Sequence, residues 1–320
     1  MNCWRVCCRW KRYWLTALEM MKILHSMDEL AALHQPVHWA MGFFDGVHRG
    51  HRQVIASADT PGSLRGVLTF ASHPLAVLAP QKQPKLITPE TEQKRALLAA
   101  AGVQVLLELP FTAELAAMEP RAFLDALRAA CPVAGISVGR NWHFGKGGVG
   151  NAAFVELYAA EHGLRACVQD MAEHEGERIC STRIREVLAA GKLPLAQAML
   201  GHPFSIAGEV EQGQKLARRL GFPTANMRVH PQAVLPPAGV YEVQTLVDGV
   251  LCRGIANLGI RPTIDEAQKV VRLETHLLDW QGNLYGRRMQ MELLRFLRPE
   301  KKFGSVDELR AQIEADVQML

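Results

Sequence analysis

The hydrophobic pattern of the sequence changes near Gly201, and this change most restricts the possible folds. Between residues 37 and 200, short apolar runs alternate with stretches that have helical spacing. Beyond Gly201, turns separate the apolar runs and helical stretches are no longer interleaved. The first pattern is typical of a parallel sheet with helices on both faces, and the second of a small antiparallel barrel. We therefore expect an α/β domain followed by an all-β domain.

Five apolar runs in the first half are expected to form the parallel sheet. They cover residues 37–41, 66–70, 103–109, 135–138 and 164–168. Good helix formers with helical spacing mark residues 51–57, 92–101, 121–130 and 153–162. In the second half, we expect strands over 239–247, 250–257, 270–278 and 289–297, with an Asp-Gly turn between the first two, and a closing helix over 306–313.

The length and the change of pattern predict the domain boundaries. At roughly 100–200 residues per domain, a chain of 320 residues is expected to have two domains. We expect an N-terminal domain over residues 21–186, a helical linker over 187–203 and a C-terminal domain over 204–320. Residues 1–20 match neither pattern, and we interpret them as a disordered extension or a miscalled start before Met20 or Met21.

Charge, apolar runs and cysteines argue against several kinds of protein. The net charge of +4 stems mostly from the first twenty residues, so nucleic-acid binding is not expected. No apolar run approaches the ~18 residues of a membrane span, so a membrane protein is not expected. The seven cysteines contain no Cys-x-x-Cys pair, and such scattered thiols are typical of a reduced, cytoplasmic protein.

The run Gly42-Phe-Phe-Asp-Gly-Val-His-Arg-Gly-His51 follows the first expected strand and opens a helix. Such a turn directs backbone N–H groups and the positive end of the helix dipole at an anion. His48 and His51 add two donors, and Gly50 leaves room for a nucleotide close to the backbone. When a nucleophile attacks the α-phosphate of a nucleotide, hydrogen-bond donors of this kind stabilise the developing negative charge, and no covalent enzyme intermediate is needed. We therefore interpret the run as a nucleotidyl-transfer site in preference to a chance pair of surface histidines.

A second run, Ser181-Thr-Arg-Ile-Arg185, precedes a helix that we expect over residues 186–190. Ser181 or Thr182 could simply cap that helix. Arg183 and Arg185 would make the cap a phosphate clamp, because guanidinium groups bind phosphate oxygens bidentately. Together with the histidines, the run fits the closing loop of a nucleotidyltransferase.

A glycine-rich run lies between these two. Gly145-Lys-Gly-Gly-Val-Gly150 matches the G-x-G-x-x-G dinucleotide fingerprint, and Asp170 follows at the usual spacing. However, the preceding expected strand ends several residues too early, and the fingerprint belongs on the first strand of a dinucleotide fold. We expect a mobile loop near the nucleotide instead.

A candidate ATP and metal site lies in the second half. The basic stretch after Gly208 contains Gly213, Lys215 and Arg218 and leads to Thr224 and Asn226, which we expect on a strand. Thr and Asn oxygens are suitable ligands for Mg²⁺ bound beside ATP phosphates. Alternatively, these residues could form only a turn, ended by a proline, that leads into a barrel strand and has no binding role.

Glu274 is the candidate general base of that half. Alternation over residues 271–277 places Leu273 and Thr275 on one face of a strand, and Glu274 and His276 on the other. A carboxylate at this point could accept a hydroxyl proton during phosphate transfer, or could lie on the solvent face of a barrel.

In this order and spacing, these runs resemble the bifunctional bacterial riboflavin kinase/FAD synthetase family over residues 22–318. The resemblance also rests on residues 69–74, 138–145, 220–226, 254–263, 274–279, 284–286 and 297–303. The chain departs from the family pattern at Ala217, where the family has glycine, at Gly148, where arginine is frequent, and at Cys180, where serine is usual.

The resemblance implies a Rossmann-like nucleotidyltransferase domain and a riboflavin kinase barrel with a terminal helix. The barrel would phosphorylate riboflavin to FMN, and the α/β domain would transfer AMP from ATP to FMN, giving FAD and pyrophosphate. By motif, the catalytic residues would be His48, His51, Arg185 and Glu274. ATP for adenylylation would be bound by Gly42, Phe44, Asp45, Gly50, Asn141, Ser181, Thr182 and Arg183. Mg²⁺-ATP for the kinase would be bound by Gly213, Lys215, Arg218, Thr224 and Asn226, and the flavin of the adenylylation site by Phe70, His73 and Pro74.

Two alternatives stay open. One is another nucleotidyltransferase that uses the His-x-Gly-His site on a different acceptor, which leaves residues 220–226 and Glu274 unexplained. The other is a non-catalytic flavin-binding regulator, against which the intact candidate residues argue. We expect riboflavin, FMN and ATP as partners, no nucleic acid or membrane, and a monomer or weak homo-oligomer.

Overall fold

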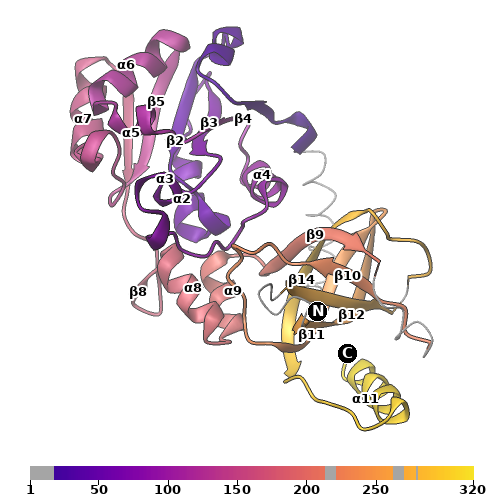
Figure 1. Ribbon diagram of the computed structural model, residues 1–320. Coiled ribbons are helices and arrows are strands. Elements are labelled where there is room, and N and C mark those ends of the chain that lie inside the picture. Colours follow the sequence, from indigo (N-terminus) through magenta and orange to yellow (C-terminus); the bar gives the residue numbers. More distant parts are fainter. Residues whose placement is uncertain (1–17, 213–220, 262–269, 279) are drawn as a thin grey trace. The chain divides into compact units, whose positions relative to one another are not determined.

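The computed structural model describes residues 18–212, 221–261, 270–278 and 280–320 (Figure 1). The first 17 residues, which are most of the expected extension, lie outside this range. Gly213, Lys215, Ala217 and Arg218 also lie outside it. The chain forms two compact units, one of Met1–Pro84 and Lys94–Ser181, the other of Lys85–Gln93 and Thr182–Leu320.

Six parallel strands form the sheet of the first unit, in the order β1-β4-β3-β2-β5-β6. They are β1 (Lys22–Leu24), β2 (Val37–Met41), β3 (Leu64–Phe70), β4 (Val105–Leu109), β5 (Val133–Gly139) and β6 (Arg165–Gln169). All five expected strands are present, and β1 was missed because three residues are too few to show a period. The strand order reverses between β2 and β5, which is the switch point where sheets of this kind bind ligands.

Helices cover both faces of this sheet, as expected (Figure 1). On β2, Trp39 packs in a core with α6 (Pro120–Ala130) and α7 (Ala152–Glu161). The next residue, Ala40, packs in a separate core with α2 (Arg49–Ser57) and α4 (Thr91–Ala100). Successive side chains of a strand point to opposite faces, so the fully buried central strand serves both cores.

Shorter elements connect the main helices and strands. They are η1 (Asp28–Ala32), η2 (Asp45–Val47), α3 (Leu75–Leu78), η3 (Pro80–Lys82), α5 (Ala113–Ala117), η4 (Lys146–Gly148) and the hairpin of β7 (Glu173–His174) and β8 (Glu177–Arg178). α8 (Ser181–Ala189), except for its first residue, and α9 (Leu193–Leu200) belong to the second unit. α9 ends where expected, with Gly201 in the left-handed conformation that terminates helices.

The expected start of α8 was wrong. This helix begins at Ser181 and not at Glu186, so the run Ser181–Arg185 forms its first turns and not a loop before it. The Ser181 hydroxyl donates a hydrogen bond to the backbone carbonyl of Asp45, 136 positions earlier in the chain. A contact over this distance could not be read from local sequence.

The second unit contains a closed antiparallel barrel in the order β10-β13-β12-β11-β14-β9. Its strands are β9 (Ser205–Glu211), β10 (Ala225–Arg228), β11 (Gly239–Val247), β12 (Val250–Arg261), β13 (Val270–Leu277) and β14 (Arg288–Arg298), followed by α11 (Val306–Gln318). The barrel and its terminal helix are confirmed. The basic stretch after Gly208 was placed too early, since residues up to Glu211 belong to β9, which pairs with both β10 and β14 to close the barrel.

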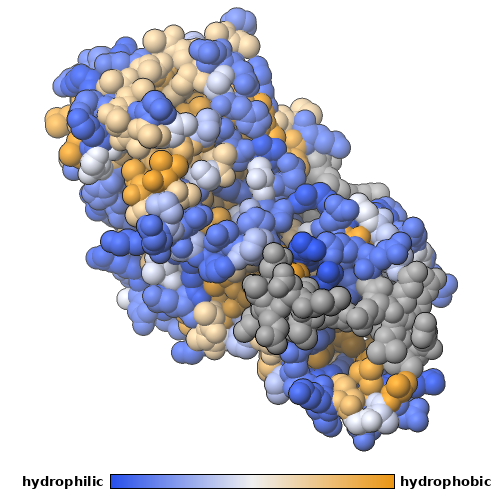
Figure 2. Space-filling model, viewed as in Figure 1, coloured by the Kyte–Doolittle hydropathy of each residue, from blue (hydrophilic) through white to orange (hydrophobic). Residues whose placement is uncertain are grey.

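In the part of the chain that the structure describes, no helix has the length and apolar character needed to cross a membrane. The face seen in Figure 2 is mainly hydrophilic, with smaller hydrophobic areas between. Cys131, Cys167, Cys180 and Cys252 are not in disulfide bonds.

His38 is a fully buried histidine in β2. Its Nδ1 lies 2.8 Å from Thr60 Oγ1 and its Nε2 lies 2.9 Å from Ser137 Oγ. Burial, with the nearby Arg165 charge, lowers the pKa of His38 to about 4. The folded protein therefore keeps this ring neutral at pH values where the unfolded chain, with a pKa of about 6.5, binds a proton.

We expect the free energy of unfolding to fall as the pH is lowered from 7 to 5, because the unfolded state then binds more protons than the folded state. The contribution of His38 at pH 5 is on the order of 2 kcal/mol. Urea unfolding at several pH values, followed by tryptophan fluorescence, measures it. His38→Gln should reduce the pH dependence, whereas His34→Gln, at an exposed position, should not. An unchanged pH dependence in His38→Gln would contradict the assignment.

Candidate functional sites

The chain leaves β2 and enters α2 through a turn with unusual backbone conformations. Phe44 and Val47 have φ angles of 57° and 38°, in the left-handed region that non-glycine residues avoid, and both side chains are fully buried. Gly46 also has a positive φ. Such conformations cost energy and persist only where surrounding contacts hold them, which is frequent at functional sites. The turn is therefore held by its environment.

His48 caps α2. Its Nδ1 accepts a hydrogen bond from the backbone N–H of His51 at 3.3 Å, a role that the sequence analysis missed. An Nδ1 that accepts leaves the proton of a neutral imidazole on Nε2. The ring is only 5% exposed and stacks on the His51 ring, with centroids 3.5 Å apart and 18° between the planes. The two histidines thus act as one stacked pair.

His51 is held in its neutral form. Burial, the neighbouring His48 and Lys94 lower its pKa well below the usual value of about 6.5. Its ring meets Phe44 edge-on at 5.2 Å, and its Nδ1 is buried with no hydrogen-bond partner among the described residues. A neutral imidazole donates through one ring nitrogen and accepts through the other.

The two glycines of this turn make room for aromatic rings. A Cβ on Gly50 would lie 3.3 Å from the His48 ring, and one on Gly42 would lie 3.1 Å from the Phe44 ring. The space at Gly50 thus serves the histidine that caps the helix. Whether a nucleotide also approaches here stays a prediction.

The expected flavin segment lies beside the histidine turn. His73 contacts the Phe43 ring edge-on at 4.7 Å, and its Nδ1 accepts a hydrogen bond from the backbone of Leu75 at the start of α3. Phe70 ends β3, and Pro74 immediately precedes α3. The segments after β2 and β3 therefore meet at the carboxyl edge of the sheet.

The other expected ATP ligands fall into both units. Asn141 follows β5, the other neighbour of β2, and its Oδ1 lies close to Gly139. Ser181 contacts the backbone of buried Asp45 within the first unit. Thr182, Arg183 and Arg185 lie in α8 and belong to the second unit.

The glycine-rich run does not have the geometry of a dinucleotide fingerprint. It lies in a loop that contains η4 and is separated from β5, and an isolated bridge joins Phe144 to Gly150. Gly145 and Gly148 have positive φ, and a Cβ on Gly145 would collide with Pro120. Glycine at position 148 thus suits the backbone there.

In the barrel, strand register aligns three polar side chains. Glu274 on β13 lies opposite Asn226 on β10 and opposite Asn257 on β12. Directly opposite residues project from the same face of a sheet. Leu273 and Thr275 are buried on the other face, so the predicted alternation is confirmed.

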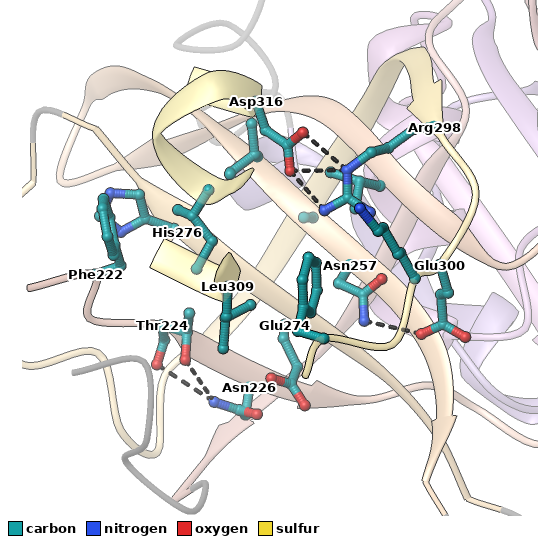
Figure 3. Close-up of a pocket in the computed structure, with 16 residues that line it drawn as sticks. Phe222, Thr224, Asn226, Asn257, Glu274, His276, Arg298, Glu300, Leu309 and Asp316 are labelled. Carbon is teal, nitrogen blue, oxygen red and sulfur yellow. Dashed lines mark hydrogen bonds and ion pairs between the residues drawn. The ribbon is translucent and has the colours of Figure 1, made fainter. Parts of the chain in front are cut away.

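A pocket covers this polar row on the outer face of the barrel (Figure 3). Thr224, Asn226 and Glu274 lie together at one end of it, and α11 forms part of its wall. Its lining comprises Phe222, Thr224, Asn226, Val240, Ile255, Ala256, Asn257, Glu274, His276, Arg298, Glu300, Lys301, Phe303, Leu309, Ile313 and Asp316.

Two polar contacts in this pocket were not predicted from the sequence. Arg298 of β14 binds Asp316 of α11 through two nitrogens at 2.8 and 2.7 Å, and Asp316 is only 1% exposed. Asn257 donates to Glu300 at 3.0 Å. Asn257 and residues 298 and 300 lay in runs that carried the resemblance, but neither composition nor spacing indicated their role. Together they hold α11 and the chain before it near the barrel.

A second pocket adjoins the first at two shared residues, Thr224 and Asn226. Its other walls include Trp280, Leu284 and Tyr285. Asn226 donates to the Thr224 hydroxyl at 3.1 Å, and His276 Nδ1 lies 2.9 Å from the Pro223 carbonyl. Thr224 itself lies one residue before β10 and not on the strand.

The oxygens of Thr224 and Asn226 fit a divalent cation of the Mg²⁺ type. The amide N–H of Asn226 donates to the Thr224 hydroxyl and so keeps the two side chains together. A hydroxyl oxygen and an amide oxygen are hard donors of the kind this ion prefers. Among the described residues, no group of three or more His, Cys, Asp or Glu could hold a metal ion. A cation here would therefore complete its coordination with substrate phosphates and water.

Comparison with known proteins agrees with the division of the chain into an α/β part and a barrel part. A model of the FAD synthetase family matches residues 30–183, and a model of the riboflavin kinase family matches residues 200–320. In solved structures, the fold is similar to a Streptococcus pneumoniae protein titled a macrolide-efflux protein, with a TM-score of 0.80 and 25% identity over 93% of this chain and 98% of the other.

Curated relatives match nearly the whole chain. A protein of Pseudomonas fluorescens is 37% identical over 306 residues, covering 93% of this chain and 96% of the relative. Relatives from Escherichia coli (37%, covering 92% and 96%) and Listeria monocytogenes (35%, covering 89% and 95%) are similar. All three are described as bifunctional riboflavin kinase/FMN adenylyltransferases. With a kinase-type pocket on the barrel and a histidine turn at the switch point of the sheet, the chain belongs to the bifunctional riboflavin kinase/FMN adenylyltransferase family.

Proposed function

We propose that this chain makes FAD from riboflavin in two ATP-dependent steps. The barrel phosphorylates riboflavin to FMN, and the α/β domain transfers AMP from ATP to FMN, releasing pyrophosphate. The observation that carries the proposal is that each domain matches its own family model and holds its own candidate phosphate-transfer residues. Riboflavin, FMN and ATP are then its small-molecule partners.

In the adenylylation step, an FMN phosphate oxygen attacks the α-phosphorus of ATP, and the bond to the β-phosphate oxygen breaks. Negative charge grows on the α-phosphoryl oxygens and on the leaving pyrophosphate. The stacked His48 and His51 and the N-terminal N–H groups of α2 would stabilise that charge. Their rigid support by the turn means that little reorganisation is needed during the reaction.

Binding of the two adenylylation substrates is assigned to the residues that the resemblance to the family indicates. Gly42, Phe44, Asp45, Gly50, Asn141, Ser181, Thr182 and Arg183 would bind ATP, with Arg185 contacting the reacting phosphates. Phe70, His73 and Pro74 would contact the flavin. The contact between Phe43 and His73 supports this, since it brings the flavin segment next to the histidine turn.

In the kinase step, Glu274 would accept the proton of the ribityl 5′-hydroxyl as its oxygen attacks the γ-phosphorus and ADP leaves. Glu274 lines the first pocket and not the second, so riboflavin would occupy the first and ATP the second. Thr224 and Asn226 line both, which supports phosphoryl transfer at that junction. Gly213, Lys215 and Arg218 would contribute to ATP binding.

We assign the divalent cation to Thr224 and Asn226, and propose that it is Mg²⁺. When bound, it would neutralise phosphate charge on ATP. The two residues would hold it through the hydroxyl and amide oxygens. A cytoplasmic location and a monomeric or weakly oligomeric state belong to the same proposal. Among the described residues, the cysteines at 131, 167, 180 and 252 are not in disulfides, which supports a reducing compartment.

His51→Ala should reduce FAD formation from FMN by roughly 10²–10³-fold, because one donor to the developing charge is lost. FMN formation from riboflavin should not change, since that reaction uses the barrel. Chromatography of products from purified protein with ATP and Mg²⁺ measures both rates. An equal loss of both activities would contradict two separate sites.

Glu274→Gln should have the opposite effect. FMN formation should fall by about 10²–10⁴-fold through loss of the general base, while adenylylation of supplied FMN should continue at its normal rate. Glu209→Gln, at an exposed position on β9, is the matched control and should leave both rates unchanged. Kinase activity that survives in Glu274→Gln would assign the base to another group.

A further inference from the structure

A buried lysine in α4, Lys94, contacts the parts of the chain that form the proposed adenylylation site. Its side chain is only 6% exposed. Its Nζ donates to Thr69 Oγ1 at 2.9 Å and to the backbone carbonyl of Phe70 at 3.2 Å. The same nitrogen lies 4.3 Å from the centre of the Phe43 ring, which is a favourable cation–π distance.

Thr69 extends this contact to the histidine turn. Its hydroxyl donates to the backbone carbonyl of Phe43 at 3.0 Å. A threonine hydroxyl has one proton, so it accepts from Lys94 while it donates to Phe43. The resulting chain of hydrogen bonds runs from α4 through the end of β3 to the turn after β2. One ammonium group therefore links the segment that carries Phe70 and His73 to the turn that carries His48 and His51.

This arrangement is costly as a purely structural device. Burying a cation requires compensating contacts, and an apolar side chain of similar size would fill the space at lower cost. Burial lowers the pKa of Lys94 to about 8, against the charges of Glu108 and Asp45, which raise it. Glu108 is itself paired with Arg95 at 2.6 Å. The ammonium is thus the main form at neutral pH, where it also favours the neutral form of His51.

We propose that Lys94 is a positioning residue for FMN adenylylation, which acts through Thr69 to hold the histidine turn in register with the flavin segment. The inference rests on the proposed role of the histidine turn. It assigns Lys94 no contact with substrate. A shift of about 1 Å between reacting groups can cost on the order of 10²-fold in rate, so loss of this link should lower turnover more than binding.

Lys94→Met keeps the length and the apolar stem of the side chain and removes the ammonium. We expect kcat for FAD formation to fall about 10- to 100-fold, with KM for ATP and FMN changed less than about threefold. Riboflavin phosphorylation by the same purified protein should be unchanged. Lys22→Met, at an exposed position in the same unit, is the matched control and should leave both reactions as they are.

Two substitutions of Thr69 distinguish the effect of its hydrogen bonds from the effect of its packing. Thr69→Val keeps the side-chain volume and loses the hydroxyl, whereas Thr69→Ser keeps the hydroxyl and loses a methyl group. The proposal requires that Thr69→Val lowers kcat for FAD formation as Lys94→Met does. It also requires that kcat of Thr69→Ser stays close to that of the unaltered protein. A role of Thr69 in apolar packing alone predicts the reverse order, because the serine variant leaves the larger cavity.

The outcomes separate this inference from the proposed function. If His51→Ala keeps normal FAD formation, the proposed role of the histidine turn is wrong. If His51→Ala loses activity while Lys94→Met and Thr69→Val keep theirs, the inference about Lys94 is wrong. Should Lys94→Met fail to fold, as shown by its thermal unfolding, the Thr69 pair alone decides: the valine variant must be the less active of the two.

Discussion

The turn between β2 and α2 is the constraint on which the first half of the structure depends. The chain leaves a fully buried central strand at the switch point of the sheet and enters a helix through two left-handed, non-glycine residues, Phe44 and Val47. Such a conformation relaxes unless its surroundings hold it. Three polar contacts do so: the cap from His48, the Thr69 bond to Phe43 and the Ser181 bond to Asp45. The histidine pair takes its position from this turn.

In the barrel, the strand register is the constraint that positions the functional side chains. Its closed antiparallel register places Asn226, Glu274 and Asn257 side by side on the outer face, while alternate residues fill the interior. An outer face is normally exposed to solvent. Here the ion pair between Arg298 and the buried Asp316 holds α11 near this face, and α11 forms a wall beside the polar row. In both domains, regular backbone geometry places the functional groups, and a few buried polar contacts keep them in place.

Much of the fold could be predicted from local pattern. The limits of β2 and β11 agree with the predicted ranges, because proline and glycine residues mark the ends of both strands in the sequence. β9 was missed because Gly208 and the charged residues beside it weaken the strand pattern, and its pairing with β10 and β14 decides its conformation. The start of α8 was wrong because Ser181 is held by a residue far away in sequence. Lys94 was missed because a single lysine in a helix rich in polar residues carries no local signal.

The sequence by itself determined the two fold classes, the family, the histidine turn and the face of β13 that carries Glu274, since each depends on residue types at short spacing. Tertiary structure alone decided that His48 caps its helix through a ring stacked on His51, that Asp316 pairs with Arg298, and that Lys94 reaches Phe43 through Thr69. The last two contacts join side chains whose distance depends on which strands and helices are neighbours, and the local histidine pair depends on a turn that Thr69 and Ser181 hold from elsewhere in the chain. Local periodicity carries no information about that, because it records only the face on which a residue lies and not what faces it.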